Sequence, residues 1–214
     1  MLSFRKETMN KGKFITLEGG EGVGKSTNLE FVRRFLESRG RQLVVTREPG
    51  GTPVGEQIRS ILLGDHPVSA ETELLLVFAS RAQHLNEVIR PALAGGLWVV
   101  SDRFTDASYA YQGGGRGIDR EFIRLLEQRV QNRLEPDLTL LFDAPVALGM
   151  ERAQKRGASD RFEMETLAFF ERVRIAYRDR AACFPQRIRM IDASRSLVAV
   201  QDEIAMHLEA FCQT

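Results

Sequence analysis

A lysine and a serine, Lys25 and Ser26, close a glycine-rich run that begins at Gly19 and reads G-G-E-G-V-G-K-S. The run matches G-x-x-x-x-G-K-[ST], in which backbone N–H groups surround phosphate oxygens because glycines let the backbone come close. A lysine here can reach β- and γ-phosphates, and the serine hydroxyl can bind Mg²⁺. A chance lysine in a glycine-rich turn would not need an apolar strand before it and a helix after it. The run therefore predicts a nucleoside triphosphate site at a helix N-terminus.

The elements that must position this run follow from the alternation of apolar and helical segments. Short, uninterrupted apolar runs predict five strands, at residues 14–17, 42–46, 97–101, 138–142 and 188–191. Helical spacing predicts helices at 25–38, 53–63, 70–93, 119–134, 146–156, 162–181 and 197–211. Strands of this kind are buried on both faces, so the pattern indicates a parallel, three-layer α/β domain. We expect one domain at 13–214 after a tail at 1–12, in which Met9 is an alternative start to Met1.

Charged residues follow several of these strands directly. In parallel sheets ligands bind beyond the carboxyl ends of the strands, which is where Asp102, Arg103 and Asp143 fall. Asp102 is expected to help hold Mg²⁺, unless it only caps the next element. Arg103 is expected to face a phosphate; a structural ion pair is the alternative.

Two further arginines flank the turn-rich segment 48–53. Arg47 precedes the turn and Arg59 follows it, so both could reach one anion. Arg59 considered alone could equally lie on a solvated helix face. The bond before Pro49 could be cis, because a cis X-Pro bond suits a tight turn.

Residues 152–163 are predicted to form a lid. Arg152, Arg156 and Arg161 lie around a short G-A-S segment between two predicted helices. Arginines on a mobile loop could stabilise a transferring phosphoryl group and exclude water. An exposed helix–loop–helix junction is the alternative.

Composition limits the class of protein. The 214 residues are 43% hydrophobic and 28% charged, which is typical of a globular protein. No apolar run approaches the ~18 residues that a membrane span requires, and the N-terminus has no signal-peptide pattern. Two cysteines without a metal or redox motif fit a cytoplasmic setting. The net charge of +1 argues against a general nucleic-acid binder.

Missing motifs narrow the chemistry. The sequence has no N-K-x-D, no L-S-G-G-Q and no H-R-D motif, which disfavours a GTPase, a transport ATPase and a protein kinase. A phosphate acceptor needs no catalytic base, because a monoester with a second pKa near ~6 is already nucleophilic at neutral pH. A kinase acting on a small-molecule phosphate therefore fits best. A deoxynucleoside kinase and a non-catalytic nucleotide-binding switch remain alternatives.

Four motifs in this order resemble the thymidylate kinase family. They are the glycine-rich run, T-R-E-P-G-G-T at 46–52, D-R-F at 102–104 and A-Y-Q-G-G-G-R-G at 110–117. The resemblance covers nearly the whole chain from about Gly12. It implies a P-loop nucleoside monophosphate kinase fold with a five-stranded parallel sheet, a homodimer, and Mg-ATP-dependent phosphorylation of dTMP to dTDP for dTTP synthesis. Another nucleoside monophosphate kinase is the nearest alternative.

The resemblance also implies a role for each matching position. ATP would be bound by Gly19, Gly20, Glu21, Gly22, Val23, Gly24, Lys25, Ser26 and Thr27, and Mg²⁺ by Ser26 and Asp102. The dTMP phosphate would be bound by Arg47, Arg59 and Arg103, the thymine ring by Arg81 and Gln112 with Ser108 nearby, and the sugar by Glu21, with Tyr111 crowding its 2′ position. Charge transfer would be assisted by Lys25, Arg103, Arg152, Arg156 and Arg161, as in the bacterial subtype, in which the lid carries the arginine that the P-loop lacks.

One position departs from the family pattern. Many members place a thymine-stacking Phe four residues before the arginine that corresponds to Arg81, where this chain has Val77. Phe78 is the next residue, and either spacing can share a helical face with Arg81. We expect Phe78 to contact the ring; packing of Phe78 in the core is the alternative.

Overall fold

The computed structural model describes residues 12–155, 162 and 165–213. Its centre is a five-stranded sheet in which every pairing is parallel, with the order β2-β3-β1-β4-β5. The strands are β1 (Phe14–Gly19), β2 (Leu43–Arg47), β3 (Trp98–Asp102), β4 (Leu138–Asp143) and β5 (Ile188–Asp192). The predicted parallel sheet is confirmed, and the expected tail lies outside the described residues except for Gly12.

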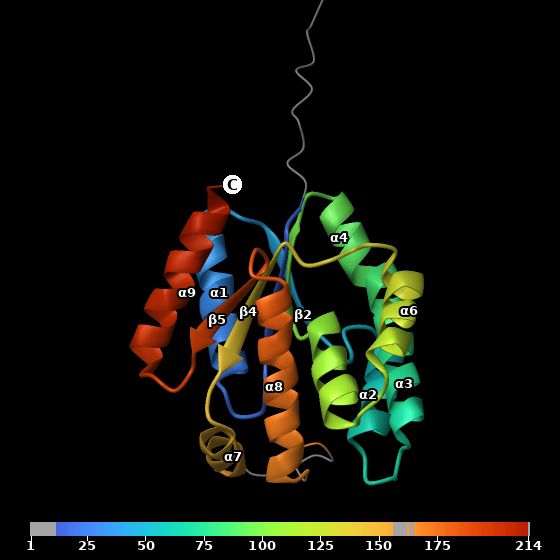
Figure 1. Cartoon of the computed structure of the whole chain (residues 1–214). Helices are drawn as coiled ribbons and strands as arrows, with labels where there is room; N and C mark the ends of the chain where they lie inside the picture. The colour runs from blue at the N-terminus through green and yellow to red at the C-terminus, as the bar shows by residue number, and fades with distance from the viewer. Residues whose placement is uncertain (1–11, 156–161, 163–164, 214) are drawn as a thin grey trace, which may run out of the picture.

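Helices cover both faces of the sheet (Figure 1). On one face lie α1 (Lys25–Ser38) and α9 (Leu197–Cys212), which share a hydrophobic cluster with β1, β3 and β4. The other face is covered by α8 (Leu167–Cys183), η1 (Leu85–Ile89) and α4 (Arg90–Ala94). On the same side of the sheet, α2 (Pro53–Leu63), α3 (Ala70–His84) and α6 (Arg120–Gln131) lie side by side, with α3 packed against both others. The molecule therefore has the predicted three-layer α/β architecture.

Several helices begin where a hydroxyl side chain satisfies a free backbone N–H. Thr52 Oγ1 accepts from Gly55 N at 2.9 Å at the start of α2, where Pro53 occupies the first position. Ser69 accepts from Thr72 N at the start of α3 in the same way. These caps fix where each helix starts, and thereby the direction in which it leaves the site.

The predicted helical segment at 70–93 is confirmed, but it contains a π-helical turn. The structure divides it into α3, the π-helical turn η1 and α4. Pro91 has no N–H to donate to the carbonyl of Glu87, so a regular α-helix cannot run through this point. The segment stays helical, and Leu85 and Ile89 of η1 are fully buried against the sheet.

The segment after β3, in which the sequence predicted no helix before residue 119, is helical. It forms α5 (Thr105–Ser108) and the π-helix η2 (Tyr109–Gly115). The glycines of η2 leave the room that α8 occupies: a Cβ on Gly115 would lie 2.5 Å from the Phe169 ring. In sequence these glycines resemble a turn, but in the structure they allow η2 and α8 to pack closely.

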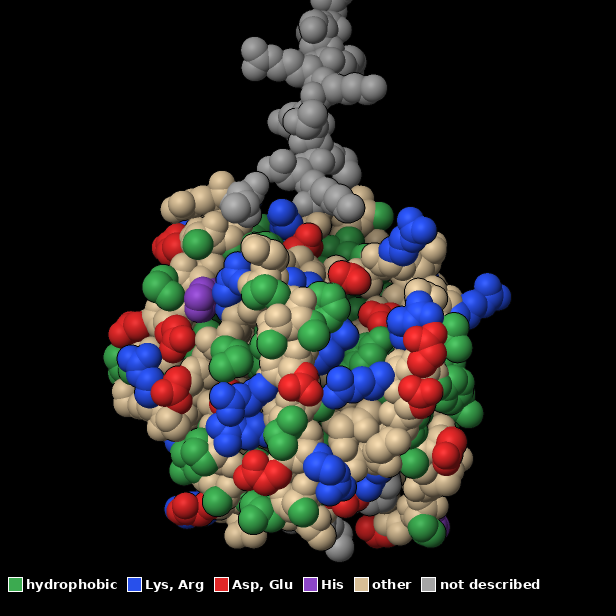
Figure 2. All heavy atoms as spheres, in the orientation of Figure 1, with side chains coloured by type: hydrophobic (Ala, Val, Ile, Leu, Met, Phe, Trp, Pro, Cys, Tyr) green, Lys and Arg blue, Asp and Glu red, His purple; other side chains and the backbone are tan. Residues whose placement is uncertain are grey.

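Charged side chains are mixed over the surface. On the face shown in Figure 2, Lys and Arg alternate with Asp and Glu and do not gather in one basic patch. In the described part of the chain, no helix combines the length and hydropathy needed to cross a membrane.

Asp106 ties α5 to the rest of the fold. Its carboxylate is 1% exposed, accepts from Arg180 Nε at 2.8 Å, and accepts from Arg187 Nη1 at 2.7 Å. Arg180 lies on α8 and Arg187 immediately precedes β5. One buried carboxylate therefore joins three segments that are distant in sequence.

We expect Asp106→Ala to lower the free energy of unfolding by about 3 kcal/mol, because it leaves two largely buried arginines without their shared partner. Asp179→Ala is the matched control: its pair with Arg120 spans 3.3 Å with both side chains more than half exposed, so its loss should cost well under ~1 kcal/mol. Urea denaturation of both variants measures the difference. Equal losses would contradict a structural role for Asp106.

Candidate active site

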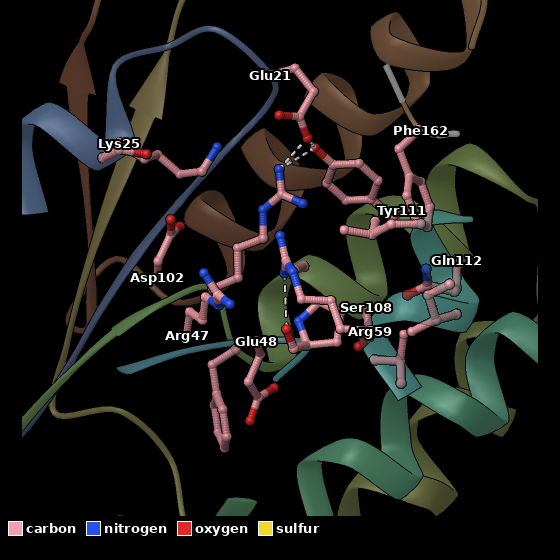
Figure 3. A pocket seen from close by; sticks show the side chains of 18 of the residues that line it. Glu21, Lys25, Arg47, Glu48, Arg59, Asp102, Ser108, Tyr111, Gln112 and Phe162 are labelled. Carbon is pink, nitrogen blue, oxygen red and sulfur yellow. Dashed lines mark hydrogen bonds and ion pairs between the residues drawn. The ribbon is translucent and has the colours of Figure 1, made fainter. Parts of the chain in front are cut away.

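A cavity of about 290 Å³ opens where the carboxyl ends of β1, β2 and β3 meet α2, α3 and η2. Figure 3 shows Lys25 and Asp102 on one side of it and Ser108 and Gln112 on the other, with Arg47 between them. The expected site residues that line it are Glu21, Gly22, Val23, Gly24, Lys25, Ser26, Arg47, Arg59, Arg81, Asp102, Arg103, Ser108, Tyr111 and Gln112. Residues from widely separated positions in the sequence thus face one space.

The glycine-rich run forms the loop between β1 and α1. Lys25 is the first residue of α1 and is buried, and its Nζ donates to the carbonyls of Gly19 at 3.0 Å and Gly20 at 2.6 Å. Burial lowers the pKa of Lys25, and the positive charge of Arg103 acts in the same direction. Gly19, Gly20 and Thr27, which were expected to bind ATP, do not line this cavity.

The helix that leads into the lid segment, α7 (Val146–Gln154), lies directly on this loop. Gly22 has a φ of +67°, and a Cβ on it would lie 1.8 Å from the carbonyl oxygen of Gly149, so only glycine fits. On the same helix Arg152 Nη1 donates to the carbonyl of Ala193 at 2.9 Å and does not line the cavity. Arg156 and Arg161, the other expected lid arginines, lie outside the described residues.

The expected Mg²⁺ ligands are compatible with that ion. Asp102 Oδ1 is buried and accepts no hydrogen bond from the described residues, and Ser26 lines the same cavity. Among the described residues, no group of three or more His, Cys, Asp or Glu side chains is placed to hold a metal. One hydroxyl and one carboxylate suit Mg²⁺, which usually keeps waters and phosphate oxygens in its shell.

The turn that carries Arg103 is held against β1. Arg103 has a φ of 69°, and its N–H donates to the carbonyl of Leu17 at 2.9 Å. The next N–H, that of Phe104, donates to Glu18 Oε1 at 2.7 Å. The strand that leads into the phosphate-binding loop therefore also positions the arginine opposite it.

The side chain of Arg103 is held by the loop itself. Its Nη2 pairs with Glu21 and donates to the hydroxyl of Tyr111 at 2.8 Å, and that hydroxyl donates to Glu21 Oε1 at 2.8 Å (Figure 3). Burial alone would raise the pKa of Glu21, but Arg103 and Lys25 outweigh burial and lower the pKa to about 2. Arg103 thus forms the ion pair considered from the sequence and also faces the cavity.

Arg47 and Arg59 line the cavity from opposite ends of the 48–53 turn. Arg47 pairs with Glu56 at 2.8 Å and is half exposed, while Arg59 Nη1 donates to the carbonyl of Pro49 at 2.9 Å. The Glu48–Pro49 bond is cis, as considered from the sequence. Arg59 is therefore not on a purely solvated face.

The far end of the cavity holds Arg81, Ser108 and Gln112. Arg81 Nη1 and Ser108 Oγ are buried, and neither has a hydrogen-bond partner among the described residues. Gln112 Nε2 donates to Glu73 Oε1 at 2.9 Å, which leaves its amide oxygen as an acceptor. Unpartnered buried polar atoms that face a cavity indicate a polar ligand.

Phe78, expected as a ring contact, does not line the cavity, whereas Val77 does. Phe78 is 2% exposed and packs with Leu74, Tyr109 and Ile123, where its ring lies 4.7 Å from the Arg81 guanidinium. The helical spacing of three that brings Phe78 beside Arg81 turns the ring toward α6 and away from the cavity. The placement of Phe78 corrects the expectation, and Val77 is the residue of the pair that lies at the cavity.

Other lining residues were not expected from the sequence. Glu48 and Phe104 line the cavity. Both belong to motifs that the sequence analysis singled out, but no role was predicted for either residue. Leu62, Leu63 and Phe162 also line it. Apolar residues carry no chemical signature in sequence, so only the packing of α2 and the position of Phe162 reveal them.

A phosphate-binding loop that faces arginines across one cavity, at the carboxyl edge of a parallel sheet, defines a P-loop phosphotransferase of the nucleoside monophosphate kinase fold. The model of the thymidylate kinase family matches residues 17–204. The chain belongs to that family.

Individual relatives agree with this assignment. A thymidylate kinase of Nitrosomonas europaea is 57% identical over 205 residues, 95% of each chain. One of Ectopseudomonas mendocina is 60% identical over 195 residues, 90% of this chain and 93% of the relative. The crystal structure of thymidylate kinase from Ehrlichia chaffeensis is 31% identical, covers 93% of this chain and 99% of its own, and has a TM-score of 0.77.

Glu18, beneath the site, gives stability a pH dependence. It is fully buried, its Oε2 accepts from Tyr177 at 2.8 Å, and burial together with the charge of Asp106 raises its pKa from about 4.5 to about 8. Between these values the native chain keeps a proton that the unfolded chain has lost. Stability from this group is therefore full below pH 4.5 and declines as the pH rises toward 8.

We expect Glu18→Gln to remove this decline. Urea denaturation at several pH values between about 5 and 8 should show native stability falling relative to that of the variant as the pH rises. Glu71→Gln, an exposed substitution in the first turn of α3, controls for a general effect of removing a carboxylate. Parallel profiles for the native protein and Glu18→Gln would contradict the shifted pKa.

Proposed function

We propose that this protein transfers the γ-phosphoryl group of ATP to dTMP, giving ADP and dTDP for dTTP synthesis. One observation carries the proposal: the phosphate-binding loop, three arginines and the buried unpartnered atoms of Arg81 and Ser108 line a single cavity. A triphosphate at the loop and a monophosphate held by the arginines would place the two reacting phosphates between them. Positioning of this kind supplies most of the catalysis in phosphoryl transfer.

The donor side is supported by the loop and the first turn of α1. Lys25 would bind the β- and γ-phosphates and stabilise the charge that develops on them. Ser26 and Asp102 would hold Mg²⁺, which supplies further charge neutralisation at the phosphate oxygens. Gly19, Gly20 and Thr27 would contribute to ATP binding from the part of the loop and helix that faces away from the acceptor.

The acceptor side is supported by residues from β2, α2, α3, α5 and η2 and from the loops that follow β1 and β3. Arg47, Arg59 and Arg103 would bind the dTMP phosphate, where guanidinium groups give directed pairs of hydrogen bonds. Arg81 Nη1, Ser108 Oγ and Gln112 would contact the base, with Val77 rather than Phe78 against the ring. Glu21 and Tyr111 would lie at the sugar, where the aromatic ring of Tyr111 disfavours a 2′-hydroxyl.

The lid would complete the charge around the transferring group. Arg152 now contacts the β5 loop through Ala193, and this loop is a reasonable place for the adenine to bind. Arg152, Arg156 and Arg161 are proposed to act when the segment at 152–163 approaches ATP. The loop carries Glu21, Gly22 and Val23 and no arginine, which supports supply of the extra positive charge from elsewhere.

A coupled assay of ADP release across dTMP, dUMP, dCMP, AMP and thymidine tests the function. We expect dTMP to give a higher kcat/KM than dCMP or AMP, because the donor at Arg81 Nη1 requires a carbonyl acceptor on the base. It should also give a higher kcat/KM than thymidine, because Arg47, Arg59 and Arg103 require a phosphate. Lys25→Ala should lose nearly all turnover with an unchanged melting curve, whereas Arg34→Ala, an exposed change on α1, should retain it. Equal turnover on AMP would overturn the thymidylate assignment, and ATP binding without acceptor-dependent turnover would favour a switch.

We also propose a homodimer, through the outer face of α2, α3 and α6. Leu75 on α3, Ile61 on α2 and Leu125 on α6 are each about half exposed, and the three helices are neighbours (Figure 1). Apolar side chains that gather on adjacent helices indicate a protein interface more than scattered ones do. The family resemblance implies the same assembly.

Light scattering on a sizing column should give twice the chain mass for the native protein at micromolar concentration. Leu75→Glu should give a monomer, because a charge buried in an interface without a partner is costly. Met206→Glu adds the same charge on α9, at an exposed position on the opposite side of the sheet, and should leave the dimer intact. A native monomer would exclude this assembly.

A further inference from the structure

A line of buried polar side chains runs from the end of β2 to the base end of the cavity. Arg81 Nε donates to Glu48 Oε2 at 2.7 Å, His84 Nδ1 lies 3.0 Å from Glu48 Oε1, and Thr46 Oγ1 lies 2.6 Å from His84 Nε2. The side chains of Arg81, Glu48 and His84 are 1%, 3% and 0% exposed. Buried charged groups in a connected network hold a single arrangement, since any other leaves one of them unpaired.

Two of the three nitrogens of the Arg81 guanidinium are held by hydrogen bonds, and the third is not. Glu48 holds Nε, and the carbonyl of Phe104 accepts from Nη2 at 3.0 Å. The guanidinium centre lies 4.7 Å from the Phe78 ring centroid and 5.0 Å from that of Phe104. A guanidinium is planar, so fixing two of its nitrogens also fixes the third. The third is Nη1, which is buried and without a partner among the described residues.

His84 fixes Glu48 in turn. A carboxylate only accepts hydrogen bonds, so Nδ1 of His84 donates to Glu48, and in a neutral imidazole Nε2 accepts from the Thr46 hydroxyl. The loop at 46–52 closes over the same ring: Gly51 has a φ of +79°, and a Cβ on it would lie 2.7 Å from His84 Nε2. Gly50 N donates to Ser80 Oγ at 3.1 Å, so α3 holds the loop at a further point.

We propose that Glu48 and His84 are positioning residues that determine specificity by setting the direction of Arg81 Nη1. The inference rests on the proposed function, because it assumes that Nη1 donates to a pyrimidine carbonyl. A donor that cannot rotate rejects a base with an amino group at that place, as in cytosine, because two donors then face each other. An arginine free to turn away discriminates less. The same loop carries Arg47, so the network also relates the base end of the acceptor site to its phosphate end.

The first arm of the test substitutes the network directly. Glu48→Gln and His84→Phe both keep most of the side-chain volume. Glu48→Gln removes the carboxylate that accepts from Arg81, and His84→Phe removes the imidazole that holds this carboxylate. We expect each to lower kcat/KM for dTMP by about 10–100-fold, since small misplacements of a binding group have effects of this size. KM for ATP should stay within about twofold, and the dTMP-to-dCMP ratio of kcat/KM should fall by about tenfold or more.

A purely structural role gives a different result. Loss of folded protein lowers turnover on both acceptors together and leaves their ratio and both KM values unchanged. His207→Phe makes the same substitution on α9 and should leave every constant as in the native protein. Thr46→Val is the milder arm, because it removes only the outermost hydroxyl of the network. It should raise KM for dTMP by about two- to fivefold and keeps the test decisive if either first-arm variant fails to fold.

Native activity separates the two proposals. If the native protein does not phosphorylate dTMP, the proposed function fails. The kcat/KM ratios of the variants are then measured with the acceptor that the native protein does phosphorylate. If native activity is as proposed, and folded Glu48→Gln, His84→Phe and Thr46→Val all keep the native dTMP-to-dCMP ratio and the native KM for dTMP, the positioning role is overturned.

Discussion

The attachment of the Arg103 turn to β1 is the interaction on which the site depends. Leu17 and Glu18 of β1 hold the backbone of residues 103 and 104, and Glu21, a few residues later, holds the Arg103 side chain. The strand that presents the phosphate-binding loop therefore also sets the distance to the arginine across from it. Register between neighbouring parallel strands, with Leu17 opposite Asp102, brings the two loops together. A shift of either strand would separate donor and acceptor, since in-line transfer tolerates little error in position.

Charge is balanced beneath the cavity by alternating signs. Glu18 and Asp106 are buried near each other, and the proton that Glu18 keeps and the two arginines on Asp106 remove the repulsion between them. Glu21 lies above Glu18 in the loop and is kept ionised by Arg103 and Lys25. The cationic side chains therefore face the cavity, and the buried carboxylates beneath the cavity balance their charge. Such an arrangement is available to phosphates without large reorganisation, which is the condition for electrostatic catalysis.

The sequence predicted the strands, their parallel arrangement and most of the cavity lining, because each rests on a local pattern. Lys25, Ser26, Arg47, Asp102 and Arg103 follow strands, and a parallel sheet brings strand ends together whatever lies between them. The π-helical turn η1 inside the predicted helical segment and the helicity of η2 were not predicted, since apolar periodicity does not separate π turns from α turns and η2 depends on the packing of α8. Phe78 was misplaced for a related reason: spacing shows that two residues share a helical face but not which way that face points. Glu48 was visible in its motif, but its role needs Arg81 and His84 beside it.

The two ends of the site are supported by different parts of the fold. The triphosphate end rests on β1 and α1 and is touched by α7 through the contact of Gly22 with Gly149. The base end rests on α3 and the loop at 46–52, and none of the hydrogen bonds described there involves a residue of α7. If the lid approaches ATP as proposed, it would act on the loop through α7, and Arg103 and Tyr111 would link the loop to the base end. Under that proposal, the direction of Arg81 is set before the lid arginines supply their charge to the transferring group.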